Sequence, residues 1–149
     1  MRGALSWSES IYWKTRALLV PELENSQVEY SRRVRAAIDE HHRWLDVGCG
    51  HGVLPAWLDR RQPPIDVAGK FAVGIDADRG ALEKHNLFTR RVEGNGETLP
   101  FGDGSFDLIT ANMVLEHVRD PASLFKEVAR VLGPGGLFLI HTPNARGPA

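Results

Sequence analysis

The sequence contains little of what marks secreted or membrane proteins. It has one cysteine, Cys49, in 149 residues, which excludes an intrachain disulfide and favours a reducing compartment. No apolar run approaches the roughly 20 residues that span a membrane. Near the start of the chain, Glu9, Lys14 and Arg16 interrupt any apolar core of a signal peptide. We therefore expect a cytoplasmic protein that makes no membrane contact.

An excess of charge of one sign is also lacking. The formal net charge is −1, and no long block of like charges occurs, whereas a dedicated nucleic-acid face is normally basic. The adjacent histidines His41 and His42 lack the i, i+4 spacing of helical metal ligands. The remaining composition, 42% hydrophobic and 25% charged, is ordinary for one globular domain. We expect a small-molecule partner, no nucleic acid and no metal.

What the sequence does contain is a concentrated glycine motif, RWLDVGCGHG, at Arg43–Gly52. A short apolar run carries one carboxylate, Asp46, and then breaks into three glycines at alternate positions: Gly48, Gly50 and Gly52. Apolar pairs at i, i+4 then predict a helix from Val53 to about Arg61, with Pro55 in its first turn. A strand, a tight turn and a helix start together favour a nucleotide-type cofactor site.

The glycine spacing distinguishes between cofactors. A dinucleotide fingerprint needs glycine at the position of Val53, so a dinucleotide oxidoreductase is disfavoured. The segment LDVGCGHG instead resembles the first motif of class I S-adenosylmethionine-dependent methyltransferases. The resemblance implies that the turn formed by Gly48, Cys49, Gly50 and Gly52 passes under the methionine part of S-adenosylmethionine. It also implies that Asp46 helps to hold the cofactor and the loop.

A second carboxylate follows the next predicted strand, Phe71–Ile75. Asp76 and Ala77 come directly after it, close to the roughly 20-residue spacing expected of a βαβ unit. A carboxylate offers two acceptors to the two hydroxyls of a ribose, so Asp76 is the predicted ribose ligand. Asp78 is the alternative, although it also suits the N-cap of a helix from Arg79 to about Phe88.

A third motif region, GNGETLPF, begins at Gly94 after a short predicted strand, Arg91–Glu93. It is similar to the ubiquinone/menaquinone-biosynthesis methyltransferases, in which an acidic residue here meets the adenine amino group. Asn95 stands in that place, and its side-chain oxygen can still accept one hydrogen bond. The resemblance places Gly96 and Glu97 beside the adenine ring. A plain surface turn is the alternative interpretation.

The remaining elements predict the fold class. Phe106–Ala111 is a fourth strand, Asp120-Pro121 starts a helix with an apolar stripe, and Leu137–Ile140 is a fifth strand. The stripe comprises Leu124, Phe125, Val128, Val131 and Leu132. We expect an α/β, Rossmann-like, doubly wound, mostly parallel sheet in a three-layer αβα arrangement with about five strands.

The family sheet normally ends in two further strands beside the fifth, and these are missing here. The resemblance therefore implies a C-terminally truncated core at residues 41–149, or a homodimer that covers the fifth strand. Residues 1–40 are expected to form helices, including one over Gln27–Glu40 and one near the aromatic cluster Trp7, Tyr12 and Trp13. These helices either pack on the sheet edge or form a lid over the cofactor and the acceptor.

The expected chemistry is methyl transfer to a small molecule by in-line displacement, which needs positioning and water exclusion. Asn112, beyond the fourth strand, is included among the cofactor-binding residues. His117 and Glu116 are the candidate general bases, with His141 next, and a bracing role is the alternative. The segment after that strand lacks the motifs of DNA methyltransferases. A domain that binds the cofactor without catalysing is the alternative function.

Overall fold

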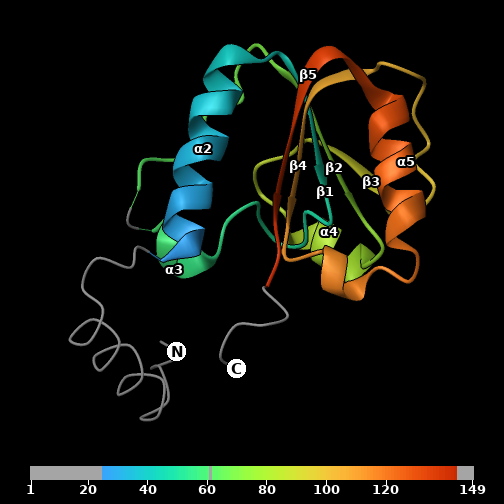
Figure 1. Ribbon diagram of the computed structural model, residues 1–149. Helices are drawn as coiled ribbons and strands as arrows, with labels where there is room; N and C mark the ends of the chain where they lie inside the picture. Colours follow the sequence, from blue (N-terminus) through green and yellow to red (C-terminus); the bar gives the residue numbers. More distant parts are fainter. Residues whose placement is uncertain (1–24, 61, 144–149) are drawn as a thin grey trace.

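The computed structural model describes residues 25–60 and 62–143, which form a five-stranded parallel sheet with helices on both faces (Figure 1). The cluster Trp7, Tyr12 and Trp13 lies outside the described residues. The elements in chain order are α2 (Ser26–Glu40), β1 (Arg43–Val47), α3 (Ala56–Asp59), β2 (Phe71–Asp76), α4 (Arg79–Lys84), β3 (Arg90–Glu93), β4 (Phe106–Asn112), the 3-10 helix η1 (Leu115–His117), α5 (Pro121–Val131) and β5 (Leu132–His141).

The strands are ordered β3-β2-β1-β4-β5, and every neighbouring pair is parallel. The chain therefore builds outward from β1 in one direction and then, at β4, in the other. Val47 at the end of β1 pairs with Ile75 of β2 and with Ala111 of β4. The carboxyl ends of these strands meet at one edge, where doubly wound folds bind ligands. The predicted fold class is confirmed.

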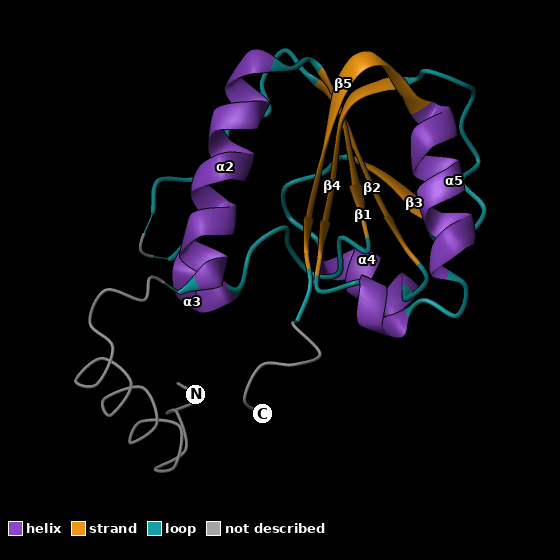
Figure 2. Ribbon diagram, viewed as in Figure 1, coloured by secondary structure: helices purple, strands orange, loops and turns teal. Residues whose placement is uncertain are grey.

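Helices lie on both faces of the sheet (Figure 2), and each face carries its own hydrophobic core. Trp44 of β1 packs on the α2 side, whereas Leu45 and Val47 pack on the α5 side. This alternation follows from the two-residue period of a strand. Most of the predicted α5 stripe is buried, but Phe125 is 45% exposed and contacts Phe138 of β5 edge-on.

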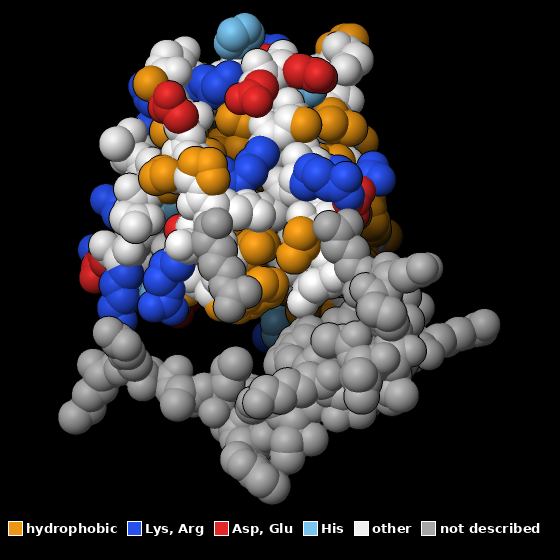
Figure 3. All heavy atoms as spheres, turned by 90° about the vertical axis from the view of Figure 1, so that its left-hand side faces the viewer, with side chains coloured by type: hydrophobic (Ala, Val, Ile, Leu, Met, Phe, Trp, Pro, Cys, Tyr) orange, Lys and Arg blue, Asp and Glu red, His pale blue; other side chains and the backbone are white. Residues whose placement is uncertain are grey.

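Helix α2 is amphipathic, as predicted. Its buried positions are Tyr30, Ser31, Val34, Ala37 and Ile38. Asn25 caps the helix by accepting a hydrogen bond from the backbone N–H of Gln27 at 2.9 Å. On the outer face Glu29 pairs with Arg32 and Arg33. Figure 3 shows basic, acidic and apolar side chains interspersed on this side of the molecule.

Two helices are shorter than predicted. Helix α3 covers only Ala56–Asp59, with Pro55 at its N-cap, so no helix begins directly after the glycine turn. The cause is Pro55, which disfavours the helical backbone at the residue before it. Helix α4 ends at Lys84 because Nδ1 of His85 accepts the backbone N–H groups of Leu87 and Phe88. His85 is buried and therefore has a structural role in this turn.

Strand β5 is longer than predicted, because the glycine-rich segment before Leu137 is part of it. The register against β4 shifts between Phe106 and Leu108, which accommodates the extra length. β5 forms one edge of the described sheet, and covering of this edge by further strands or by a second copy stays a prediction. Within the described residues, no helix has the length and hydropathy needed to cross a membrane.

Candidate functional site

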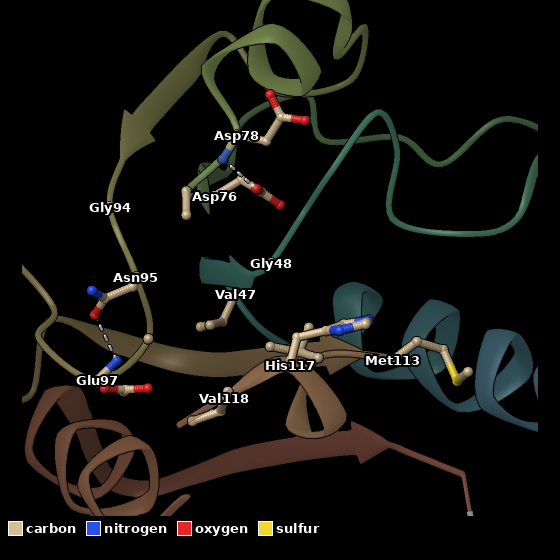
Figure 4. A pocket seen from close by; sticks show the side chains of 13 residues that line it. Val47, Gly48, Asp76, Asp78, Gly94, Asn95, Glu97, Met113, His117 and Val118 are labelled. Carbon is tan, nitrogen blue, oxygen red and sulfur yellow. Dashed lines mark hydrogen bonds between the residues drawn. The ribbon is translucent and has the colours of Figure 1, made fainter. Parts of the chain in front are cut away.

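An open cavity of about 500 Å³ lies at the carboxyl edge of the sheet (Figure 4). It is lined by Val47, Gly48, Asp76, Ala77, Asp78, Gly94, Asn95, Gly96, Glu97, Met113, Val114, His117 and Val118. The loops after β1, β2, β3 and β4 all contribute. Six of the predicted cofactor residues and one of the predicted bases are therefore brought together, whereas the others lie outside the lining.

The turn after β1 is shaped for close backbone approach. Gly48 has φ +67°, and its N–H and that of Cys49 both donate to the carbonyl of Ile75, at 2.8 and 3.1 Å. A Cβ at Gly48 would collide with Cγ2 of Val114. Gly50 also has a positive φ, of +52°, but nothing lies within 4 Å of its Cβ position. Only glycine fits at Gly48 without displacing a neighbour.

Asp76 joins the end of β2 to this turn. Its Oδ2 accepts the backbone N–H of Gly50 and its Oδ1 accepts that of Asp78, each at 2.8 Å. The side chain is half-buried and lines the cavity, as Figure 4 shows. Asp78 caps α4 by accepting from the N–H of Ala81 at 3.2 Å, so its predicted N-cap role is confirmed. The end of β2 thus presents a carboxylate that is fixed beside the glycine turn after β1.

The turn after β3 is held by its own side chains. Oδ1 of Asn95 accepts the backbone N–H groups of Glu97 and Thr98, at 3.0 and 3.1 Å. The oxygen predicted to meet adenine is therefore occupied within the turn. Oε1 of Glu97 accepts the N–H groups of Arg119 and Asp120. Gly96 packs so closely that a Cβ would lie 2.5 Å from Cδ1 of Leu124.

Asp46 does not line the cavity. Its side chain is 2% exposed and accepts a hydrogen bond from Oγ1 of Thr110, which in turn accepts from Nε1 of Trp44 at 2.8 Å. Burial, aided by the nearby Asp76 carboxylate and opposed by the Thr110 hydrogen bond, raises the pKa of Asp46 to about 7. Asp46 therefore links β1 to β4 through Thr110. Because side chains alternate along a strand, Asp46 lies on the face of the sheet that α2 covers.

The glycine turn also contains three predicted residues that do not line the cavity: Cys49, Gly50 and Gly52. The Cys49 thiol is buried against Gly74, where a Cβ would lie 2.7 Å from its Sγ. Burial, with smaller contributions from Asp46 and Asp76, raises the pKa of this thiol, which leaves it a poor nucleophile. The N–H of Gly52 closes the turn by donating to the carbonyl of Cys49 at 3.1 Å.

Two of the remaining predicted residues brace helix α2. Nδ2 of Asn112 donates to Oε1 of Gln27 at 3.2 Å and to the carbonyl of Val53 at 3.4 Å. Nδ1 of His141 lies 3.0 Å from Oδ1 of Asn112, and its Nε2 lies 3.0 Å from Oγ of Ser26. Burial lowers the pKa of His141, and the nearby Glu116 carboxylate opposes this shift.

Only one of the two main base candidates faces the cavity. Glu116 lies outside the lining and accepts a hydrogen bond from Oγ1 of Thr142 at 3.3 Å. His117, at the end of η1, lines the cavity, and its imidazole makes no hydrogen bond within the described part of the chain.

The model of a methyltransferase domain family matches residues 23–149 of the sequence. The chain belongs to this family. A probable S-adenosylmethionine-dependent methyltransferase from Mycolicibacterium smegmatis is 36% identical over 103 residues, which are 67% of this chain and 37% of the relative. A ubiquinone biosynthesis O-methyltransferase from Alkalilimnicola ehrlichii is 34% identical over 113 residues, covering 70% and 43%.

A solved S-adenosylmethionine-dependent methyltransferase from Mesorhizobium loti has the same fold. It superposes with a TM-score of 0.54 at 28% identity and covers 67% of this chain and 45% of its own. This methyltransferase chain spans between 30% and 51% of the length of the curated relatives that it matches. The predicted family is confirmed.

Sequence reasoning missed several residues that line the methyltransferase cavity: Val47, Gly94, Met113, Val114 and Val118. Asp78, which also lines it, was weighed mainly as a helix cap. Val47 carried a usable signal, since it precedes Gly48 directly. Met113 carried none. Its φ of +57° is the only positive value at a non-glycine position in the described residues, and methionine gives no sequence warning of such a turn.

Proposed function

We propose that this chain is the cofactor-binding part of an S-adenosylmethionine-dependent methyltransferase that acts on a small molecule. The observation that carries the proposal is the Asp76 carboxylate, which is hydrogen-bonded to Gly50 of the glycine turn and faces the same cavity as Gly48. Family membership supports the reaction class, and the names of the relatives support the cofactor.

The residues present fit this cofactor. An ionised carboxylate offers about four lone-pair sites. Gly50 and Asp78 occupy one site on each oxygen of Asp76, which leaves one on each for the two ribose hydroxyls. The backbone of Gly48, which lines the cavity, would hold the methionine part. Ala77, Asn95 and Gly96 would border the adenine ring.

When bound, the cofactor would supply an electrophilic methyl group. A lone pair of the acceptor would form the new bond to the methyl carbon, and the electron pair of the broken carbon–sulfur bond would stay on the sulfur. The cavity walls would align the acceptor with the methyl group and exclude water. His117 is exposed in the cavity, and its unengaged ring would accept the proton that a hydroxyl acceptor releases.

The calorimetric test uses this chain with three ligands. S-adenosylmethionine and S-adenosylhomocysteine are expected to bind with micromolar dissociation constants, whereas NAD is expected not to bind. Binding of NAD alone would overturn the proposed function.

The second candidate is a domain that binds the cofactor without catalysing transfer. It is supported by the position of Glu116, one of the two base candidates, outside the cavity lining. An acceptor screen with this chain beside a longer chain that contains it separates the two. Turnover by this chain would exclude the second candidate, and turnover by the longer chain alone would support it.

Two further features of the proposal concern partners and location. The net charge of −1 supports a small-molecule acceptor over nucleic acid. The single cysteine supports a cytoplasmic location. A homodimer through the edge of β5 would also bury Leu137, which is 37% exposed. Sedimentation at increasing concentration tests it, and a monomer throughout would exclude it.

A further inference from the structure

The cavity lining divides into two chemically different ends. We call the part of the lining that carries the carboxylates of Asp76, Asp78 and Glu97, together with Asn95, the cofactor end. In Figure 4, Met113 and His117 lie at the end away from Asn95 and Glu97. Among the described lining residues there is no lysine or arginine. An anionic acceptor would therefore find no lysine or arginine to pair with in this lining.

Met113 has a backbone conformation that methionine rarely takes. Its φ is +57°, which glycine or asparagine adopts at lower energy. Its N–H donates to the carbonyl of His141 at 2.7 Å, so the β4–β5 ladder pins this turn. The turn directs Val114 against Gly48 and leaves the Met113 side chain 39% exposed at the cavity. Neither the backbone nor core packing accounts for a large apolar side chain at this place.

We propose that Met113 is the acceptor-recognition residue and that the acceptor is an uncharged molecule with a hydrocarbon or aromatic body. The inference rests on the proposed function, because it takes the Asp76 end to be filled by the cofactor. A thioether side chain is flexible and polarizable, so it adapts to irregular apolar surfaces. At the Met113 end, neither a carboxylate nor an ammonium group of an acceptor would meet a lysine, an arginine or a carboxylate of the described lining. Desolvating an unpaired charge is unfavourable, so recognition favours the uncharged compound.

The composition of the chain offers a direct probe. Its two methionines are Met1 and Met113, so labelling the methionine methyl groups with carbon-13 gives one signal from the cavity and one from the first residue. The Met113→Leu variant assigns the signals. The labelled chain is first saturated with S-adenosylhomocysteine. It is then titrated with three compounds that share one apolar body: para-butylphenol, para-butylbenzoate and para-butylbenzylamine.

The Met113 methyl signal is expected to shift with para-butylphenol, while the Met1 signal stays in place. The benzoate and the protonated amine are expected to bind at least roughly tenfold more weakly. Equal or tighter binding of either charged compound, or phenol binding that leaves the Met113 signal unmoved, would overturn the inference. If S-adenosylhomocysteine itself fails to bind in calorimetry, the proposed function fails instead, so the two failures are distinguishable.

A pair of variants gives a second readout. Met113→Lys is expected to reverse the preference, binding para-butylbenzoate more tightly than para-butylphenol, with the affinity for S-adenosylhomocysteine changed less than about twofold. Met113→Leu keeps the apolar wall and is expected to keep the preference of the original chain. Circular dichroism establishes that both variants are folded. An unchanged preference in folded Met113→Lys would contradict the inference.

Discussion

The two ends of the cavity differ in how far their polar groups are already engaged. At the cofactor end, each carboxylate oxygen of Asp76 accepts a hydrogen bond from one backbone N–H. One side-chain oxygen of Asn95 and one of Glu97 each accept hydrogen bonds from two backbone N–H groups. At the other end, the Met113 and His117 side chains are exposed, and the His117 ring has no hydrogen bond within the described residues. One end is preorganised by the fold, whereas the other is free to meet a ligand.

This difference separates two tasks. A preorganised site loses little entropy when a ligand binds, which suits a cofactor that is always the same molecule. Exposed side chains that make no hydrogen bonds within the protein add little affinity of their own, but they can discriminate between acceptors. The comparison predicts that substitutions at the cofactor end disturb stability and cofactor affinity, whereas those at the other end leave both nearly unchanged.

The largest effect is expected for Gly48→Ala. A left-handed alanine costs about 1–2 kcal/mol, and the collision with Val114 adds about 1–3 kcal/mol. Unfolding in urea should show a loss of about 2–5 kcal/mol. Gly50→Ala, with a positive φ but open space, should lose about 1–2 kcal/mol. Gly52→Ala should change stability by less than about 0.5 kcal/mol. Equal losses at the three positions would contradict the geometry.

Asp46→Asn tests the buried carboxyl beneath the cofactor end. Its pKa is about 7 when folded and 3.8 in the reference state, so between about pH 4 and pH 7 only the folded chain holds this proton. Stability therefore falls as pH rises through that window, and the asparagine variant removes this loss. As pH rises from about 4 to about 7, the unfolding free energy of the variant minus that of the original chain should increase by about 2–4 kcal/mol. A pH-independent difference would mean that Asp46 ionises normally.

Asp76→Asn should weaken the binding of S-adenosylhomocysteine by about 1.5–3 kcal/mol, or roughly 10- to 150-fold, because a charge-assisted pair is lost. Asp78→Asn is the matched control, since asparagine still caps α4. Calorimetry should find this control within about threefold of the original chain. If the control loses more affinity than Asp76→Asn, Asp78 is the ribose ligand.

The smallest effect is expected for His117→Gln, at the unengaged end. The ring contributes no hydrogen bond to the described structure, so the affinity for S-adenosylhomocysteine should change less than about twofold and stability by less than about 0.5 kcal/mol. Calorimetry and urea unfolding measure both. A loss comparable to that of Asp76→Asn would erase the distinction between the two ends.

Sequence reasoning worked where a local pattern fixes the outcome. Gly48 and Asp76 were predicted to meet, because parallel strands end at a common edge and both follow strands. It was less successful where side-chain direction matters. Asp46 was predicted to hold the cofactor, yet the pairing of β1 turns it toward Thr110. Asn112 lies at the predicted edge, but its amide is used by Gln27 and Val53.

By itself, the sequence determined the order of strands and helices, the glycine turn and the carboxylate that follows β2. These rest on periodicity and short spacings, which are properties of neighbouring residues. Only the tertiary structure decided which side chains share the cavity and which of their oxygens are already engaged. The contacts of Asp76 with Gly50, of Glu97 with Arg119 and of Asp46 with Thr110 join residues between 22 and 64 positions apart along the chain, and no local pattern encodes such contacts.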